Sequence, residues 1–344
     1  RQTVGQDGVY HPILCNDNTL GPTLTKLTST LCDEAFHFEQ WLTSPYMPTP
    51  TIIEAAQALY RGHDVKEISR SDAGAYNLSL TTKALNRIIE QSKQHHEKSI
   101  CFVTGVPGAG KTLVGLNIAN ERHQYDEQEH AVFLSGNGPL VAVLREALAR
   151  DEIKRFKGKI TKTASKRKVA AFIQNIHHFR DAYLPPSEQV PAEKVAIFDE
   201  AQRAWTKEQT AKFMLKRHVP GWNMSEPEFL ISVMDRHQDW TVIICLIGGG
   251  QEIHTGEAGL LAWFDALRDH FPDWNVYVSP QISDVEYTHG KPLEHLFTGL
   301  RLYREPNLHL SVSLRSFRNE RVSAFVKSLL DENLPVAQQL YSEL

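Results

Sequence analysis

One eight-residue segment limits the fold of this 344-residue chain more than any other feature. It comes directly after an apolar run at 100–104 and directly before a run with helical periodicity at 112–122. Its glycines allow a loop so tight that backbone N–H groups surround a phosphate at the N-terminus of the following helix. Strand, phosphate-binding loop and helix in this order predict an α/β fold. The loop residues are Gly105, Val106, Pro107, Gly108, Ala109, Gly110, Lys111 and Thr112.

The end of this loop and a second, acidic motif predict a site for ATP and Mg²⁺. Lys111 is expected to neutralise the β- and γ-phosphates, and the Thr112 hydroxyl is expected to bind Mg²⁺. Because the metal also needs a carboxylate, an acidic residue should follow a later strand. Asp199 and Glu200 occur at the end of the apolar run 194–198. Asp199 is the expected metal ligand, and Glu200 is the expected base for the attacking water.

The acidic pair also separates hydrolases from other nucleotide-binding classes. GTPases read guanine with an Asn-Lys-x-Asp motif, and this sequence contains no Asn-Lys dipeptide. Small-metabolite kinases usually lack a catalytic glutamate next to the metal ligand. ATP hydrolysis is therefore favoured over transfer of phosphate to a substrate.

Short β-rich runs alternate with amphipathic segments from residue 99 onward, which predicts a mainly parallel sheet with helices on both faces. Upstream, a capping box predicts a helix over 51–60, and an apolar face predicts another over 79–92. Three prolines in 44–50 indicate a linker. The expected strands are 100–104, 131–135, 194–198, 241–247, 275–279 and 308–312, and the expected later helices are 112–122, 139–150, 207–216, 259–269 and 317–330.

Composition excludes several classes of protein. The formal net charge is −4, so bulk charge does not attract the whole molecule to nucleic acid. The longest apolar runs have strand length, well short of the roughly 20 residues of a membrane-spanning helix. The four cysteines lie far apart without a Cys-x-x-Cys pair, so neither a zinc ribbon nor a disulfide framework is predicted. A reducing cytoplasm is the simplest location.

The acidic motif, Asp199-Glu200-Ala201-Gln202, resembles the second motif of superfamily 1 helicases and, more specifically, the Schlafen group 3 type DNA/RNA helicase domain family. The resemblance implies a RecA-like P-loop NTPase fold, ATP and Mg²⁺ as cofactors, and DNA or RNA, in single-stranded form, as partner. Further matching blocks are 49–55, 105–112, 133–140, 248–259 and 313–318.

The resemblance implies two more site residues. Gln251 matches the glutamine of the third helicase motif, which senses the γ-phosphate; an amide can donate to a phosphate oxygen and accept from the attacking water. Arg315 matches the fourth-motif arginine, which reaches the γ-phosphate from the opposing lobe. The structural alternative for the third-motif block is that residues 248–250 form only a tight glycine turn. The alternative for Arg315 is an ordinary surface arginine, and the neighbouring Arg318 is a second candidate for its role.

The resemblance also implies the domain organisation. Too few residues follow Arg315 for a complete second RecA-like lobe, so either the chain is truncated or the protein lacks full unwinding machinery. The helicase-like part often follows a nuclease-type domain in this family, so a fused or associated nuclease is an expected partner. The expected parts are a tail of an upstream domain with a Pro-rich linker (1–50), a helical lead-in (51–98), a RecA-like ATPase lobe (99–305) and an incomplete second lobe (306–344).

One basic segment is the candidate nucleic-acid contact. Residues 154–168 carry eight cations in fifteen positions, and no acidic residue occurs in 153–180. Lys166, Arg167 and Lys168 lie at its end, between the second and third expected strands, where superfamily 1 enzymes touch the nucleic-acid strand. A solvated basic loop explains the same pattern equally well.

The expected function is an ATP-dependent DNA/RNA helicase or translocase-type ATPase, with hydrolysis coupled to nucleic-acid binding. The alternative is an ATP-switched binding or assembly module, for instance in defence against foreign DNA, that unwinds nothing. A P-loop kinase is a third and less favoured alternative. Stimulation of hydrolysis by nucleic acid separates the first two.

Overall fold

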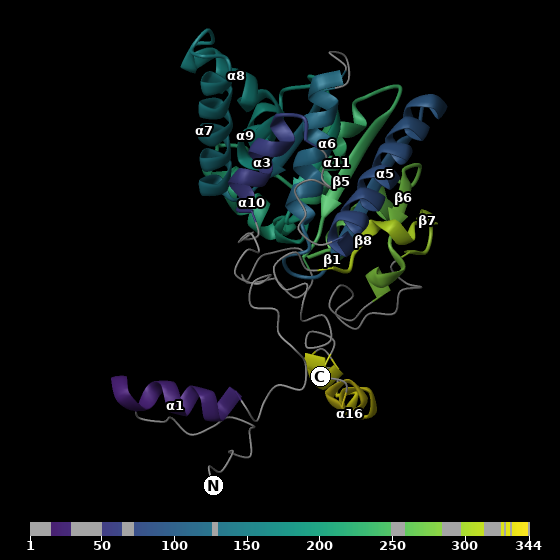
Figure 1. Cartoon of the computed structure of the whole chain (residues 1–344). Helices are drawn as coiled ribbons and strands as arrows, with labels where there is room; N and C mark the ends of the chain where they lie inside the picture. Colours follow the sequence, from purple (N-terminus) through teal and green to yellow (C-terminus); the bar gives the residue numbers. More distant parts are fainter. Residues whose placement is uncertain are drawn as a thin grey trace. The chain divides into compact units, whose positions relative to one another are not determined.

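The computed structural model describes residues 15–28, 50–63, 72–125, 130–248, 259–283, 297–312 and 325–342, the last range without 327 and 331. The chain divides into two compact units, Arg1–Pro48 and Thr49–Leu344. The described part of the first unit contains helix α1 (Asp17–Thr28). The described strands and the other described helices belong to the second unit (Figure 1).

The second unit is built on a parallel sheet with the strand order β3-β2-β4-β5-β1-β6-β7, and β8 pairs with the end of β1. Every described strand pairing is parallel. One strand, β5, separates β1, which leads into the phosphate-loop sequence, from β4, which ends in the acidic pair. The strands are β1 (Lys98–Gly105), β2 (His130–Ser135), β3 (Ile173–Asn175), β4 (Glu193–Asp199), β5 (Thr241–Leu246), β6 (Asn275–Val278), β7 (Arg301–Arg304) and β8 (His309–Leu310).

Two layers of helices cover the sheet because its central strands are apolar on both faces. Cys101 and Val103 of β1 pack with α3, α5, α6, α7 and α8, whereas Ile100 and Phe102 pack with α9, α11 and α12. Burying one such side chain stabilises the fold by about 1.5–3 kcal/mol. The helices are α3 (Ile52–Tyr60), α5 (Asp72–His95), α6 (Lys111–Tyr125), α7 (Gly138–Arg155), α8 (Lys162–Phe172), α9 (Ile176–Ala182), α10 (Lys207–Lys216), α11 (Glu226–Asp235), α12 (Leu261–His270) and α16 (Leu334–Ser342).

The expected fold class is confirmed, and local signals explain much of the agreement. The predicted capping box opens α3: the Thr51 hydroxyl accepts from the Glu54 N–H, and the Glu54 carboxylate accepts from the Thr51 N–H. The helix expected at 207–216 has those bounds. The strand expected at 308–312 is shorter, because Pro306–Leu308 forms a 3-10 turn and only His309–Leu310 pairs. Most of the helix expected at 317–330 lies outside the described residues.

The sequence reasoning missed several elements, among them β3, β7, α8, α9 and α11. Helix α11 has a capping box formed by Ser225 and Glu228, a signal that should have identified it. In helix α8 the large apolar residues, Val169 and Phe172, come only after a run of cations, so the buried face that they form with Ser165 is hard to recognise in the sequence. No helix in the described part of the chain is long and apolar enough to cross a lipid bilayer.

Candidate functional site

The phosphate-loop sequence forms a tight connection between β1 and α6. Gly108 and Gly110 have positive φ angles of 77° and 92°, a conformation that other residues adopt at a cost. A Cβ atom at Gly105 would lie 2.7 Å from the Leu310 carbonyl oxygen, so β8 approaches too closely for any side chain there. Glycine is therefore required in this loop for two reasons, backbone conformation and the proximity of another strand.

Lys111 is the first residue of α6 and is only 9% exposed. Its Nζ donates to the carbonyl oxygen of Gly105 at 2.7 Å and to that of Val106 at 3.3 Å. Burial lowers the pKa of the ammonium group, and the nearby carboxylates of Glu200 and Asp199 oppose this shift. The loop thus holds a buried cation on neutral carbonyl groups, which an anionic ligand can replace.

Asp199 ends β4 and faces two hydroxyl groups from neighbouring elements. Thr112 Oγ1 donates to Asp199 Oδ1 at 3.2 Å, and Ser135 Oγ donates to Asp199 Oδ2 at 3.3 Å. Burial raises the pKa of Asp199 to about 7, and the charge of Glu200 adds to the effect. Sequence reasoning did not identify Ser135; the only available signal was its position at the end of β2, which pairs with β4.

Glu200 follows with a left-handed backbone, φ 54° and ψ 46°. For a residue with a side chain this conformation costs roughly 1–2 kcal/mol, and such strain is concentrated at functional sites. It turns the chain sharply, so that Asp199 is buried while the Glu200 side chain is 34% exposed. Two adjacent carboxylates thereby occupy different environments.

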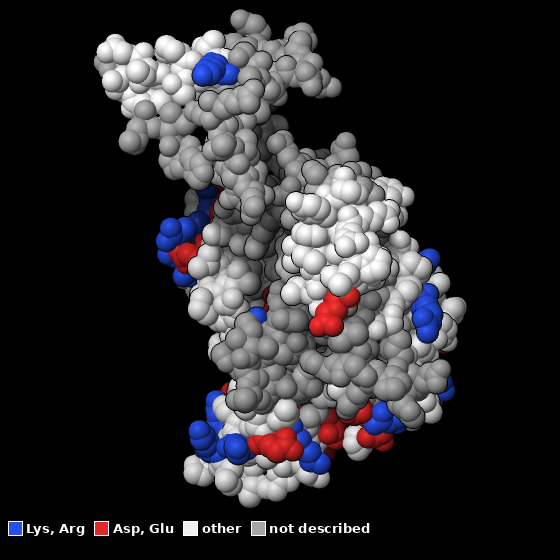
Figure 2. Space-filling view, turned by 90° about the horizontal axis from the view of Figure 1, so that it is seen from below, with Lys and Arg blue, Asp and Glu red and all other residues white. Residues whose placement is uncertain are grey.

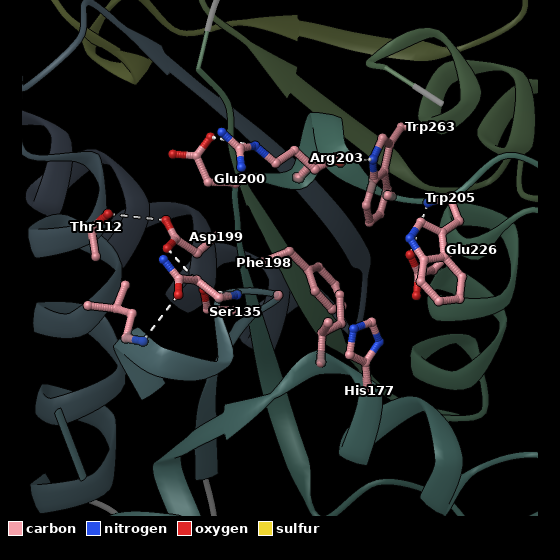
Figure 3. Close-up of a pocket in the computed structure, with 16 residues that line it drawn as sticks. Thr112, Ser135, His177, Phe198, Asp199, Glu200, Arg203, Trp205, Glu226 and Trp263 are labelled. Carbon is pink, nitrogen blue, oxygen red and sulfur yellow. Dashed lines mark hydrogen bonds and ion pairs between the residues drawn. The ribbon is translucent and has the colours of Figure 1, made fainter. Parts of the chain in front are cut away.

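A cavity of about 410 Å³ lies beside this acidic pair. Figure 3 shows Thr112, Asp199 and Glu200 on one side of the cavity and His177 and Trp205 on the other. Burial lowers the pKa of His177. The cavity therefore has a polar end, formed by the oxygen atoms of Thr112, Asp199 and Glu200, and an aromatic end, formed by His177 and Trp205.

Trp205, which follows the acidic motif, is packed among aromatic and charged side chains. The Arg180 guanidinium lies 4.9 Å from the centroid of its ring, and the Phe213 ring packs edge-on at 5.3 Å. The Trp205 backbone N–H donates to the Glu226 carboxylate, which also forms a buried ion pair with Arg180 at 3.0 Å. The network fixes the chain that leaves the acidic motif.

The basic segment forms the end of α7 and most of α8. Lys162 and Lys166 pair with Glu146 at 3.2 and 2.6 Å, and Lys168 pairs with the buried Glu152 at 2.9 Å. Arg167 is exposed and forms no ion pair with any residue that the structure describes. On the face of the molecule drawn in Figure 2, basic and acidic side chains lie next to each other.

The structure therefore brings Lys111, Thr112, Asp199 and Glu200 together. Gln251 and Arg315 lie outside the described residues, so their predicted positions are not tested.

Comparisons with known proteins identify the family of this chain. A model of the Schlafen group 3 DNA/RNA helicase domain matches residues 98–343. No curated protein matches the sequence significantly. Among solved structures, the helicase domain of Hef from Pyrococcus furiosus is 13% identical over 60% of this chain and 40% of that chain, with a TM-score of 0.31. Because the family model covers well over half of the sequence, the chain belongs to the Schlafen group 3 DNA/RNA helicase domain family.

Proposed function

We propose that this helicase-like chain is an ATPase of the helicase or translocase type, which hydrolyses ATP·Mg²⁺ when it binds DNA or RNA. The observation that carries the proposal is the meeting of Thr112 and Asp199, 87 residues apart, beside Lys111 and Glu200. A buried cation, a hydroxyl, a buried carboxylate and a second, partly exposed carboxylate are the groups that phosphoryl transfer to water requires.

The described donor atoms fit a magnesium–nucleotide complex. Mg²⁺ prefers oxygen ligands and is commonly held by one or two protein groups plus phosphates and water. Thr112 and Asp199 offer such oxygens side by side, and a cation would favour the charged form of the desolvated Asp199 carboxylate. Mg²⁺ in such sites polarises phosphate oxygens and neutralises developing charge.

In the proposed mechanism, each described residue has one task. Lys111 leaves the Gly105 and Val106 carbonyls and donates to phosphate oxygens, and the loop N–H groups add further donors. Thr112 and Asp199 hold the metal. Glu200 accepts the proton of the attacking water through its exposed carboxylate. Gln251 as γ-phosphate sensor and Arg315 as opposing cation complete the proposal, outside the described part of the chain.

The proposed partner is single-stranded DNA or RNA, held through its phosphates by Lys166, Arg167 and Lys168. Pairing of Lys166 with Glu146 and of Lys168 with Glu152 weakens this part of the proposal and favours the alternative, an ATP-switched assembly module. A second lobe that begins at residue 306 and an upstream nuclease are proposals of the same kind.

The experiment is an ATPase assay on the purified chain with and without single-stranded DNA or RNA oligonucleotides, with Lys111→Ala as negative control. Mg²⁺-dependent hydrolysis that rises with oligonucleotide, together with strand displacement from a labelled duplex, supports the proposal. Hydrolysis that ignores every oligonucleotide supports the assembly module. No hydrolysis above the Lys111→Ala background contradicts both.

A further inference from the structure

Gln202 is fully buried in the 3-10 turn Ala201–Arg203, two residues after the proposed base. Its Nε2 donates to Glu200 Oε2 at 2.5 Å, and its Oε1 accepts from the Gly248 N–H at 3.2 Å. Its backbone carbonyl accepts from the Gly259 N–H at 3.1 Å. One residue thus joins the Glu200 carboxylate to the chain just after β5 and to the chain just before α12.

The network determines which way the Gln202 amide points. A backbone N–H can only donate, so the atom of Gln202 that faces Gly248 must be the oxygen. The NH₂ group therefore faces Glu200, whose carboxylate can accept it. Because an unsatisfied buried amide is unfavourable, the side chain has no alternative orientation of comparable free energy.

Further contacts hold the turn itself. Trp263 Nε1 donates to the Ala201 carbonyl oxygen at 2.9 Å, and the Gly259 N–H donates to the carbonyl oxygen of the next residue, Gln202. The other described polar neighbour of the Glu200 carboxylate is Arg203 Nε, at 3.9 Å on a 40% exposed side chain. The short contact with the buried Gln202 side chain is therefore what fixes a carboxylate that is otherwise partly open to solvent.

We propose that Gln202 is a positioning residue that orients the Glu200 carboxylate toward the attacking water by anchoring it to the backbone of Gly248. The inference rests on the proposed ATPase function, in which Glu200 is the base. Without the amide, Glu200 turns toward Arg203 or solvent, so turnover falls while the phosphate-loop contacts that bind nucleotide are unchanged.

The test compares Gln202→Met, which keeps the shape of the side chain without its hydrogen bonds, with Gln57→Met as the matched control. Gln57 donates one hydrogen bond from α3 to Ala147, far in sequence from the acidic motif. In Gln202→Met we expect kcat to fall about 10- to 100-fold, with KM and the affinity for a non-hydrolysable ATP analogue within twofold. Gln57→Met should keep the wild-type kcat.

A double-mutant cycle distinguishes positioning from general structural support. In the Glu200→Gln background, Gln202→Met should cause little further loss, because the group that it orients is already gone. A second variant, Gln202→Glu, keeps an oxygen that accepts from the Gly248 N–H but places a second oxygen against the Glu200 carboxylate. We expect its kcat to fall at least as much as that of Gln202→Met. This variant also provides a test if Gln202→Met does not fold.

Three outcomes overturn the inference: wild-type kcat in Gln202→Met, equal losses of kcat and nucleotide affinity, or full additivity with Glu200→Gln. Failure of the proposed function is a different result. It would be seen as absent hydrolysis in the wild-type chain, or as wild-type hydrolysis in Glu200→Gln.

Discussion

Lys111 and Asp199 are buried without an ion-pair partner among the described residues, whereas the three lysines of α8 are exposed and all form ion pairs. Burial shifts the pKa of both groups toward the neutral form, downward for Lys111 and upward for Asp199. In α8, Lys162 and Lys166 share the Glu146 carboxylate, whose pKa they lower to about 2 together with Arg150.

The difference shows which charges are available to a ligand. A desolvated charge without a partner gains free energy when an opposite charge binds, because the cost of desolvation has already been met by folding. An exposed, paired lysine must first give up its carboxylate, and its interactions are screened by salt. The phosphate-loop site is therefore prepared for an anion, whereas α8 offers mainly Arg167.

The largest effect should come from Glu200→Gln. The amide keeps the size of the side chain but cannot accept a proton, so we expect kcat for ATP hydrolysis to fall about 10²–10⁴-fold while ATP remains bound. Single-turnover hydrolysis and filter retention of labelled ATP measure the two quantities. Wild-type hydrolysis in this variant would show that another group is the base.

Lys111→Ala should have the next largest effect, on nucleotide affinity. Loss of charge-assisted bonds to phosphate should weaken ATP binding about 10- to 100-fold. Isothermal titration measures it, and Lys212→Ala, an exposed lysine on α10, is the control. An unchanged ATP affinity would mean that the Lys111 ammonium stays on the Gly105 and Val106 carbonyls when nucleotide binds. The phosphate-loop site would then be no more available to an anion than the paired lysines of α8.

Substitutions in and next to the basic segment should have a smaller effect, on the salt dependence of single-strand binding. Whether the salt slope becomes steeper or flatter shows which cations contact phosphates. If α8 contacts phosphates, Arg167→Ala should reduce the log–log salt slope of single-strand binding by about 0.7, and Lys166→Ala should reduce it less. Glu146→Gln releases Lys162 and Lys166, so it should steepen the slope. Fluorescence anisotropy with a labelled oligonucleotide measures all three. Equal slopes in the wild type and every variant would favour a solvated basic helix.

The smallest expected effect concerns how α8 is held. Tyr60 donates to the buried Glu152 carboxylate at 3.1 Å, and Ser165 and Lys168 bind the same group. Tyr60→Phe should lower the free energy of unfolding by about 1 kcal/mol without changing ATP affinity. Urea unfolding measures it, with the exposed Tyr76→Phe as control. Equal unfolding free energies would show that this bond adds nothing to the anchoring of α8.

Much of the fold could be predicted because its signals are local. Central strands such as 194–198 are apolar on both faces, and the capping box at Thr51 predicts where a helix begins. The missed elements have weaker signals: β3 has only three residues, and the buried face of α8 is interrupted by lysines. Secondary structure at these places depends on packing against other parts of the chain.

The sequence by itself determined the phosphate loop, the acidic pair and the parallel sheet, because glycine positions, apolar runs and their order along the chain are local properties. Only the tertiary structure decided which groups surround each charge. Ser135 reaches Asp199 because β2 lies beside β4, and Gly248 reaches Gln202 because β5 lies on the other side of that strand. The carboxylates that pair with α8 come from α7, which precedes the stretch 153–180 that lacks acidic residues. Such contacts depend on strand order and helix packing, which no local pattern encodes.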